Sequence, residues 1–339
     1  MINLNSIIKE LRKEKIFIDK YIEINNSFNS RAFLLESENG EKYFLKNFIY
    51  DALNTHNRLK SEVYFSKYLL ENNLNNIPKL ICYSITSNWI LYDWIEGEKV
   101  KKITHYNVKD LIEFLIKINL NLKNHKNYDL PNASEACFSI VGHKVLITKK
   151  IKASINRIDQ NNQIDPNLKK LIIFELEEKI VLINNLLRKK EFSNKDFIKY
   201  SLNKYQKCIS PSDVGFHNII NSKGKSFYVD FEYAGIDDPC KLIADLILQP
   251  DYPIPPDLIH HLLKLVNNLK KDIPDFQKRF LLIFELYKIK WFCIIFNPII
   301  KNRIVKNHND ISKKILAKAM KYFDKFENNQ QTLITILEN

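Results

Sequence analysis

Residues 209–220 read ISPSDVGFHNII, and after a short turn residues 226–235 read SFYVDFEYAG. The first part contains the pattern D-x-x-x-x-N, formed by Asp213 and Asn218. The second part is an apolar strand pattern that ends at Asp230. Because the connecting residues are rich in Asn, Ser, Lys and Gly, they favour a tight turn. We therefore predict a short hairpin that brings Asp230 next to the loop of Asp213 and Asn218.

The side chains of this stretch are those that phosphoryl transfer uses. Magnesium prefers oxygen ligands, and an Asp at a strand end with an Asn on the adjacent loop can hold it from two sides. Asn218 and Asp230 are therefore the predicted metal ligands. Asp213 lies five residues before Asn218 and can orient an acceptor hydroxyl and accept its proton. For Asp213 and Asn218 alone the alternative is an ordinary turn, because both residue types cap backbone groups well.

The hydrophobic periodicity changes near Gly97. Before it the chain reads β-β-β-α-β-β, with strands predicted at 16–24, 31–37, 42–48, 79–84 and 89–92. Helices are predicted at 1–14, 57–71, 106–122, 143–158, 166–190, 257–271, 276–296 and 310–327, with a β-rich island at 205–232. Asn39-Gly40 predicts a hairpin with a type I′ turn.

This order of elements predicts an α+β fold of two lobes. Residues 1–96 would form a small, mainly antiparallel lobe, and residues 97–339 a large helical lobe, with a hinge at about 92–97. A nucleotide would bind in the cleft between the lobes, because ligand pockets often lie between domains.

Several other classes of protein are disfavoured by composition. The six glycines form neither G-x-G-x-x-G nor G-x-x-x-x-G-K-[ST], so a Rossmann site and a P-loop are poor interpretations. The five cysteines are odd in number and lack a C-x-x-C pair, and the N-terminus lacks a signal-peptide pattern, so we expect a cytoplasmic protein. The most apolar stretch, 281–300, contains Glu285, Lys288 and Lys290, which predicts a buried helix and not a membrane span.

The chain carries a net positive charge. Lys and Arg number 52 and Asp and Glu 39, which gives 52 − 39 = +13. An anionic partner such as nucleic acid is one interpretation. The lysines are spread along the chain, however, which is typical of a solvated surface, and no recognition helix or aromatic-basic motif is visible. We therefore expect no nucleic-acid partner and no membrane partner.

Lys46 is the second candidate for the site. It alternates with Phe44 and Phe48 and so shares their face of the predicted strand. A lysine on an apolar face needs an anion, which Glu62 or a phosphate would supply. Taken singly, Lys46 could be an exposed strand residue and Glu62 a solvated helix residue.

The whole set resembles the aminoglycoside phosphotransferase and choline kinase family, relatives of the protein kinases, over about residues 15–250. VDFEYAG at 229–235 resembles the metal-binding segment of the family, close to its choline kinase form. Lys46, at the end of YFLK, resembles the third-strand lysine of the family, and Glu62, within LKSEV, resembles the helical ion-pair partner of that lysine. LYDWIEG at 91–97 resembles the hinge that carries adenine.

The resemblance implies a protein-kinase-like fold, ATP and Mg²⁺ as cofactors, and phosphorylation of a hydroxyl on a small molecule such as a sugar or an amino alcohol. It implies the following roles: α/β-phosphate binding by Lys46, orientation of Lys46 by Glu62, adenine binding by backbone groups of Asp93 and Ile95, base catalysis by Asp213, metal binding by Asn218 and Asp230, and phosphate contact by Ser27 in the loop 25–30. The segments around Asp213 and 133–139 resemble a bacterial branch associated with surface-glycan metabolism.

Two departures leave alternatives open. The family usually has His-Gly before the catalytic Asp, where this chain has Pro211-Ser212, so one alternative is a catalytically inactive nucleotide-binding module. The loop 25–30 has Asn and Ser where protein kinases have glycines.

His217 is expected to be a loop or supporting residue, and Glu232 either a metal or acceptor ligand or a surface residue. Lys288 and Lys290 are expected to extend outward from a packed helix, the alternative being that one of them lines the acceptor pocket.

Overall fold

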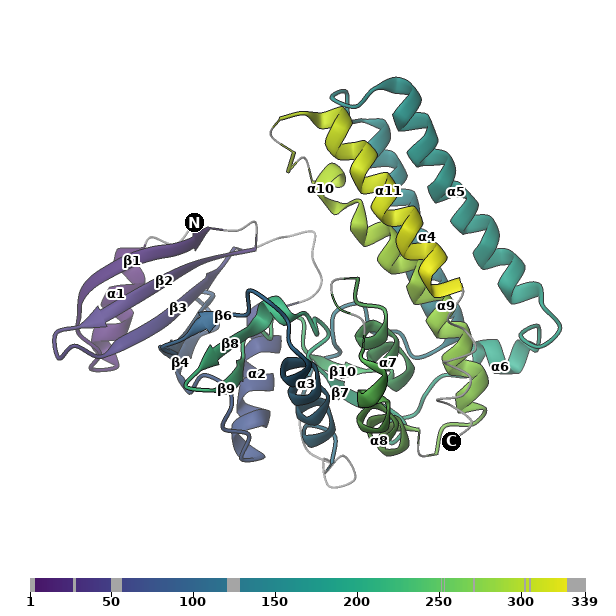
Figure 1. The fold of residues 1–339 in the computed structure, drawn as a ribbon. Coiled ribbons are helices and arrows are strands. Elements are labelled where there is room, and N and C mark those ends of the chain that lie inside the picture. The colour runs from purple at the N-terminus through teal and green to yellow at the C-terminus, as the bar shows by residue number, and fades with distance from the viewer. Residues whose placement is uncertain are drawn as a thin grey trace. The chain divides into compact units, whose positions relative to one another are not determined.

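The computed structural model describes residues 4–26, 29–49, 57–120, 129–250, 252, 254–270, 272–301, 303–304 and 306–327. The chain forms two compact units (Figure 1). Unit 1 joins residues 1–134 to residues 209–236, and unit 2 consists of residues 135–208 and 237–339. The stretch that contains Asp213 and Asp230 therefore belongs to the same unit as Lys46. The predicted lobe boundary near residue 97 stays a prediction.

Unit 1 is built on a five-stranded antiparallel sheet in the order β1-β2-β3-β5-β4. Its strands are β1 (Ile18–Asn26), β2 (Ser30–Ser37), β3 (Lys42–Phe48), β4 (Leu80–Ser84) and β5 (Trp89–Asp93). Helix α1 (Leu4–Lys13) precedes the sheet, and α2 (Arg58–Glu71) connects β3 to β4. The predicted β-β-β-α-β-β order is confirmed.

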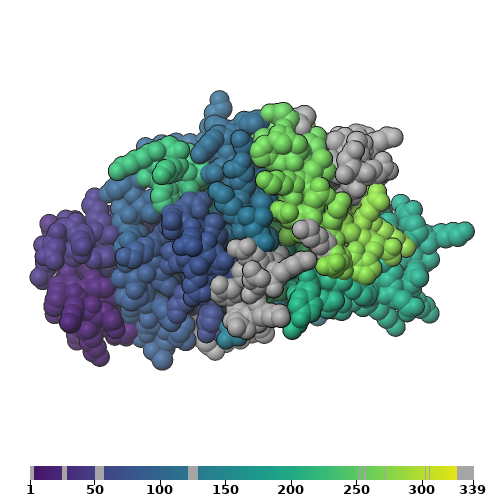
Figure 2. Space-filling model, turned by 90° about the horizontal axis from the view of Figure 1, so that it is seen from below, coloured from purple at the N-terminus to yellow at the C-terminus, as the bar shows by residue number. Residues whose placement is uncertain are grey.

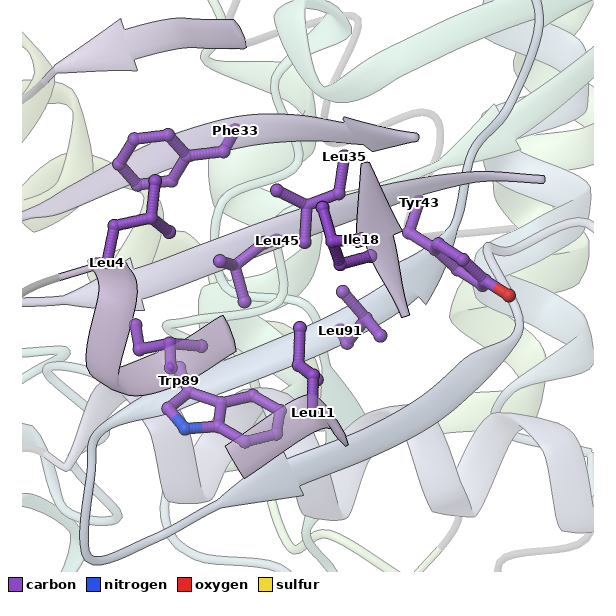
Figure 3. Packing of buried hydrophobic residues seen from close by; sticks show 10 residues of the cluster. Leu4, Leu11, Ile18, Phe33, Leu35, Tyr43, Leu45, Trp89 and Leu91 are labelled. Atoms are coloured by element: carbon purple, nitrogen blue, oxygen red, sulfur yellow. The ribbon is translucent and has the colours of Figure 1, made fainter. Parts of the chain in front are cut away.

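The two faces of this sheet are covered by different helices. On one face α1 packs against alternate strand residues; this cluster contains Leu4, Ile7, Leu11, Ile18, Phe33, Leu35, Tyr43, Leu45, Trp89 and Leu91 (Figure 3). On the other face α2 packs against the intervening residues; this cluster contains Phe48, Leu59, Val63, Ile90 and Tyr92. Each fully buried side chain of this size contributes about 1.5–3 kcal/mol. Lys46 alternates with Phe48 and therefore lies on the α2 face, as its spacing predicts.

The hairpin between β2 and β3 is confirmed, but its predicted turn type is wrong. The Gly40 N–H donates to the Ser37 carbonyl at 2.9 Å, and the Ser37 N–H donates to the Glu41 carbonyl at 2.8 Å. Gly40 has a φ of +79°, whereas Asn39 is not among the residues with positive φ. The loop is therefore one residue longer than a type I′ hairpin and places only its glycine in the left-handed region.

The rest of unit 1 carries the predicted β-rich island. Strands β8 (Ile219–Ser222) and β9 (Lys225–Tyr228) form the predicted hairpin, and β8 also pairs with β6 (Glu98–Lys99). In Figure 2 the green surface of this hairpin lies against the blue surface of the segment that includes β6. Helix α3 (His105–Lys117) begins at a Thr104 capping box, a short 3₁₀ turn spans Phe216–Asn218, and β7 (Cys208–Ser210) pairs with β10 (Gly235–Asp237).

Unit 2 is helical, and its long helices lie side by side (Figure 1). Its helices are α4 (Ile140–Asp159), α5 (Pro166–Arg188), α6 (Lys195–Lys199), α7 (Pro239–Ile247), α8 (Ile259–Leu269), α9 (Phe276–Ile295), α10 (Asn297–Ile300) and α11 (His308–Glu327). The predicted helices are present, while the short α6, α7 and α10 were not predicted. No helix within the described residues is both long and apolar enough to cross a membrane.

The prediction that Lys288 and Lys290 extend outward from α9 is wrong. Both side chains are buried. Lys288 Nζ lies 2.9 Å from a Glu285 oxygen, and Lys290 Nζ donates to Asp245 Oδ1 at 2.8 Å. A buried ammonium is tolerated only when it is paired, and these carboxylates supply the pairing. A role for either lysine in an acceptor pocket stays a prediction.

Candidate active site

Lys46 is the centre of a buried charge cluster in unit 1. Its Nζ donates to Glu62 Oε2 of α2 at 2.8 Å and to Asp230 Oδ1 at 2.6 Å, and it lies 3.1 Å from Glu232 Oε2. Glu62 and Asp230 are 16 and 184 residues from Lys46 in the sequence. The fold therefore brings together side chains from three separate segments of the chain. Tyr92, a buried residue at the start of the predicted hinge, also donates to Glu62, to Oε1 at 3.3 Å.

The charges of this cluster do not balance. Burial alone would lower the pKa of Lys46, but the carboxylates of Glu62, Asp230 and Glu232 outweigh burial and raise its pKa well above the usual value. Burial and the two neighbouring carboxylates raise the pKa of Glu62 to about 7, although Lys46 opposes the shift. One ammonium therefore compensates three carboxylates incompletely, and the cluster favours an additional cation.

A divalent cation fits the donor atoms of this cluster. One oxygen from each of Glu62, Asp230 and Glu232 lies within 4.8 Å of the other two. Glu62 and Glu232 are buried, whereas the Asp230 side chain is 45% exposed. Carboxylate oxygens are the ligands that Mg²⁺ prefers, and Mg²⁺ typically uses one or two of them. The exposed Asp230 is the most accessible of the three.

Asp213 lies on the loop between β7 and the 3₁₀ turn. Its Oδ1 accepts from the Gly215 N–H at 3.2 Å, and its Oδ2 lies 3.3 Å from His217 Nε2. Burial would raise the pKa of Asp213, but hydrogen bonds from His217, Gly215 and Asn218 lower it below the usual value. The Asp213 carboxylate is therefore ionised at neutral pH and can accept a hydrogen bond.

Asn218 connects the loop of Asp213 to the segment of Asp230. The Asn218 carbonyl accepts from the Val229 N–H at 3.0 Å, and its amide lies 3.5 Å from the Asp213 carbonyl oxygen. His217 lies close to both Asp213 and Asp230. The Asp213 carboxylate raises the pKa of His217, Asp230 raises it more weakly, and burial opposes both effects. The structure thus places Asp213, Asn218 and Asp230 in one neighbourhood, as the predicted hairpin requires.

The loop before Asp213 is braced by serines. The Ser212 N–H donates to Ser210 Oγ at 2.9 Å, and Ser212 Oγ donates to the Ser134 carbonyl at 3.3 Å. The Ser134 N–H in turn donates to the Tyr233 carbonyl at 2.8 Å. Ser212 has a φ of +62° and Asp230 a φ of +68°. Non-glycine residues rarely adopt this region, and such strain is concentrated at functional sites.

The predicted hinge continues from β5. The Asp93 N–H donates to the Lys79 carbonyl at 3.0 Å and the Trp94 N–H to the Lys42 carbonyl at 3.1 Å. Among the residues that the structure describes, none accepts a hydrogen bond from the Ile95 N–H. This group can therefore donate to a ligand. Predicted adenine binding by the backbone of Asp93 and Ile95 stays a prediction, and the predicted phosphate contact Ser27 lies outside the described residues.

An apolar surface lies on the same sheet face as Lys46. Ile22 pairs with Leu34, and Leu34 pairs with Phe44, two residues before Lys46. Directly paired residues project to the same face of a sheet. Leu34 and Phe44 are partly exposed and Ile22 is 62% exposed. A planar, apolar group such as a nucleobase can pack on these side chains.

The structure adds two residues that sequence reasoning did not assign. Glu232 is buried in the cluster, which excludes the surface role that was its alternative. Asn29 Nδ2, directly before β2, donates to Glu232 Oε1 at 3.1 Å and to the Tyr233 hydroxyl at 2.8 Å. The D-x-E spacing of Asp230 and Glu232 is the sequence signal for the first. No local signal points to Asn29, because its partners lie more than 200 residues away.

Comparison with known proteins identifies the fold. No family model matches the chain, and no curated protein matches its sequence. Solved structures match along almost all of its length. The choline kinase of Cryptosporidium parvum Iowa II is 16% identical with a TM-score of 0.57, covering 99% of each chain. The choline kinase LicA of Streptococcus pneumoniae is 15% identical with a TM-score of 0.55, covering 95% of this chain and 99% of LicA.

Aminoglycoside phosphotransferases match as well. The ADP-bound enzyme APH(2'')-Ib is 16% identical with a TM-score of 0.52, covering 94% of this chain and 97% of that enzyme. The chain has the kinase-like fold of these enzymes. The predicted α+β class, with an antiparallel N-terminal sheet followed by a mainly helical remainder, is thereby confirmed. At these identities the likeness to choline kinases and aminoglycoside phosphotransferases establishes the fold, and the chemistry must be argued from the side chains.

Proposed function

We propose that this protein is an ATP- and Mg²⁺-dependent kinase that phosphorylates a hydroxyl group of a small molecule. The observation that carries the proposal is the contact of Lys46 with both Glu62 and Asp230. An ion pair between strand and helix that also reaches an exposed carboxylate presents an ammonium and an acidic group to the same ligand. A metal-bound triphosphate combines the two charges that this arrangement accepts.

The residues divide the work of the reaction as follows. Lys46 donates hydrogen bonds to phosphate oxygens, and Glu62 fixes the direction of its ammonium group. Asp230 and Asn218 would hold Mg²⁺, with Glu232 as a further carboxylate beside them. Bound Mg²⁺ supplies positive charge that offsets the charge of the phosphates.

Asp213 acts on the acceptor. A bond forms between the acceptor oxygen and the γ-phosphorus while the bond from that phosphorus to the β,γ-bridging oxygen breaks, and the products are the phosphate ester and ADP. The acceptor proton moves to the Asp213 carboxylate, which its hydrogen bonds keep ionised. Ile22, Leu34 and Phe44 would support the adenine ring, and the Ile95 N–H would donate to its edge.

The experiment that tests this proposal uses labelled ATP and a small-molecule extract. Wild-type protein with MgATP should transfer the γ-phosphate to at least one extract component, whose identification names the acceptor. Asp213→Ala should bind ATP with unchanged affinity and lose about 10²–10⁴ in rate. Nucleotide binding without transfer by the wild type would indicate the inactive module instead, and equal transfer by both proteins would remove Asp213 from its role.

A further inference from the structure

Both oxygens of the Asp213 carboxylate are held by residues of its own loop. The Gly215 N–H donates to Oδ1, and the imidazole of His217 lies 3.3 Å from Oδ2. An ionised carboxylate offers about four lone-pair directions, so these contacts leave others for an acceptor hydroxyl. Contacts at both oxygens also fix the rotation of the carboxylate plane, which the contact at Oδ1 alone would not.

Gly215 makes room for the His217 ring. A Cβ on residue 215 would lie 2.2 Å from Cε1 and 2.3 Å from Nδ1 of His217. The backbone does not require glycine here, since φ −72° and ψ 141° are available to any residue. The absent side chain is therefore needed for the ring, which occupies the space that a side chain of residue 215 would fill.

This contact adds little to folding. The side chains of His217 and Asp213 are 65% and 35% exposed, and a contact that water screens to this extent contributes at most about 1 kcal/mol to stability. The ring nevertheless contacts the Asp213 carboxylate. In this loop the residues before Asp213 are Pro211 and Ser212, and neither is a histidine.

We propose that His217 is a positioning residue, which orients the Asp213 carboxylate toward the acceptor hydroxyl. Its ring can reach the carboxylate because Gly215 leaves the space that the ring occupies. This inference rests on the proposed function and adds a residue to it. The donor at the ring nitrogen supplies the orientation. A side chain of similar reach with an N–H donor should therefore replace His217, and one that only fills the volume should not.

The test compares His217→Ala, His217→Phe, His217→Gln and Gly215→Ala. His105→Ala, which changes an exposed histidine of α3, is the matched control. Phosphate release from MgATP, with water as the acceptor, gives kcat and KM, and calorimetry gives the nucleotide Kd. His217→Ala and His217→Phe should lower kcat by about 10- to 100-fold, with the nucleotide Kd and the unfolding midpoint unchanged. His217→Gln should restore most of the rate.

Gly215→Ala should lower kcat to a similar extent by displacing the ring, and it should add little when combined with His217→Ala, because the ring is then absent. An unchanged kcat in His217→Ala beside an active wild type would refute this inference and leave the proposed function intact. A fall in kcat matched by a weaker nucleotide Kd would also refute it, since His217 would then contact the nucleotide. A wild type that binds no nucleotide would refute the proposed function and this inference with it.

Discussion

Replacing Lys46 by Met tests the charge cluster without reference to catalysis. Methionine keeps much of the aliphatic stem and removes the ammonium group. Glu62 and Glu232, whose side chains are 2% and 5% exposed, then lose the cation that pairs with them. Removing one partner of a buried ion pair costs about 3–5 kcal/mol. Asp230 is 45% exposed, so water screens its share and it adds little.

The pH dependence follows from Glu62. Its pKa of about 7 in the folded protein lies above its ordinary value of 4.5, so the stability linked to this group is present below 4.5 and is lost as pH rises through 7. Removing Lys46 raises the folded pKa further, which lets Glu62 stay protonated and neutral in mild acid. We expect Lys46→Met to lower the free energy of unfolding by about 3 kcal/mol at pH 8 and by about 1 kcal/mol at pH 5.

The assay is urea unfolding from pH 5 to 8, followed by tryptophan fluorescence, to which the buried Trp89 of unit 1 contributes. Lys101→Met is the matched control, because Lys101 forms an exposed pair with Glu98 at 2.8 Å that water screens, so this variant should lose much less stability than Lys46→Met at pH 8. Lys46→Met with Glu62→Gln should be more stable than Lys46→Met alone at pH 8. A loss no greater than in Lys101→Met, or a loss that grows toward acid, would refute the reasoning.

Two further predictions concern the loop of Asp213 and the core of unit 2. Ser212→Gly should be about 1 kcal/mol more stable than Ser212→Ala in urea unfolding, because both variants lose the hydroxyl and only glycine relieves the positive φ; equal stability would contradict a left-handed Ser212. Asp238 is fully buried, and although burial opposes the shift, His143 and Arg279 lower its pKa to about 2. Its contribution of about 2 kcal/mol is therefore present above pH 4 and lost toward pH 2, so Asp238→Asn should be less stable at pH 7 with a shallower acid transition; an acid transition of unchanged steepness would count against this pairing.

Features that depend on local pattern could be predicted from the sequence. Strand alternation places Lys46 on the face of Phe44 and Phe48, and the sheet follows that alternation. The hairpin after Asn218 follows from a turn sequence between two apolar runs. The same hairpin keeps Asp213, Asn218 and Asp230 close together. Its first strand, β8, has only four residues, which leaves little freedom in the spacing of these side chains.

Features that depend on distant partners could not be predicted. Lys290 is buried because Asp245, 45 residues away, pairs with it, and no periodicity in α9 carries that information. The turn at Gly40 differs from type I′ because the register between β2 and β3 sets the loop length. The serine brace before Asp213 depends on Ser134, 78 residues earlier, and only the fold brings that segment to Ser212.

The most direct test of the central claim is calorimetric titration of ATP, with and without Mg²⁺, into the wild type and Asp230→Ala. We expect the wild type to bind ATP more tightly when Mg²⁺ is present, because Asp230 and its neighbours supply oxygen ligands beside Lys46. Asp230→Ala should bind ATP without that gain. A wild type that binds no ATP, or a variant that keeps the full magnesium dependence, would contradict the account.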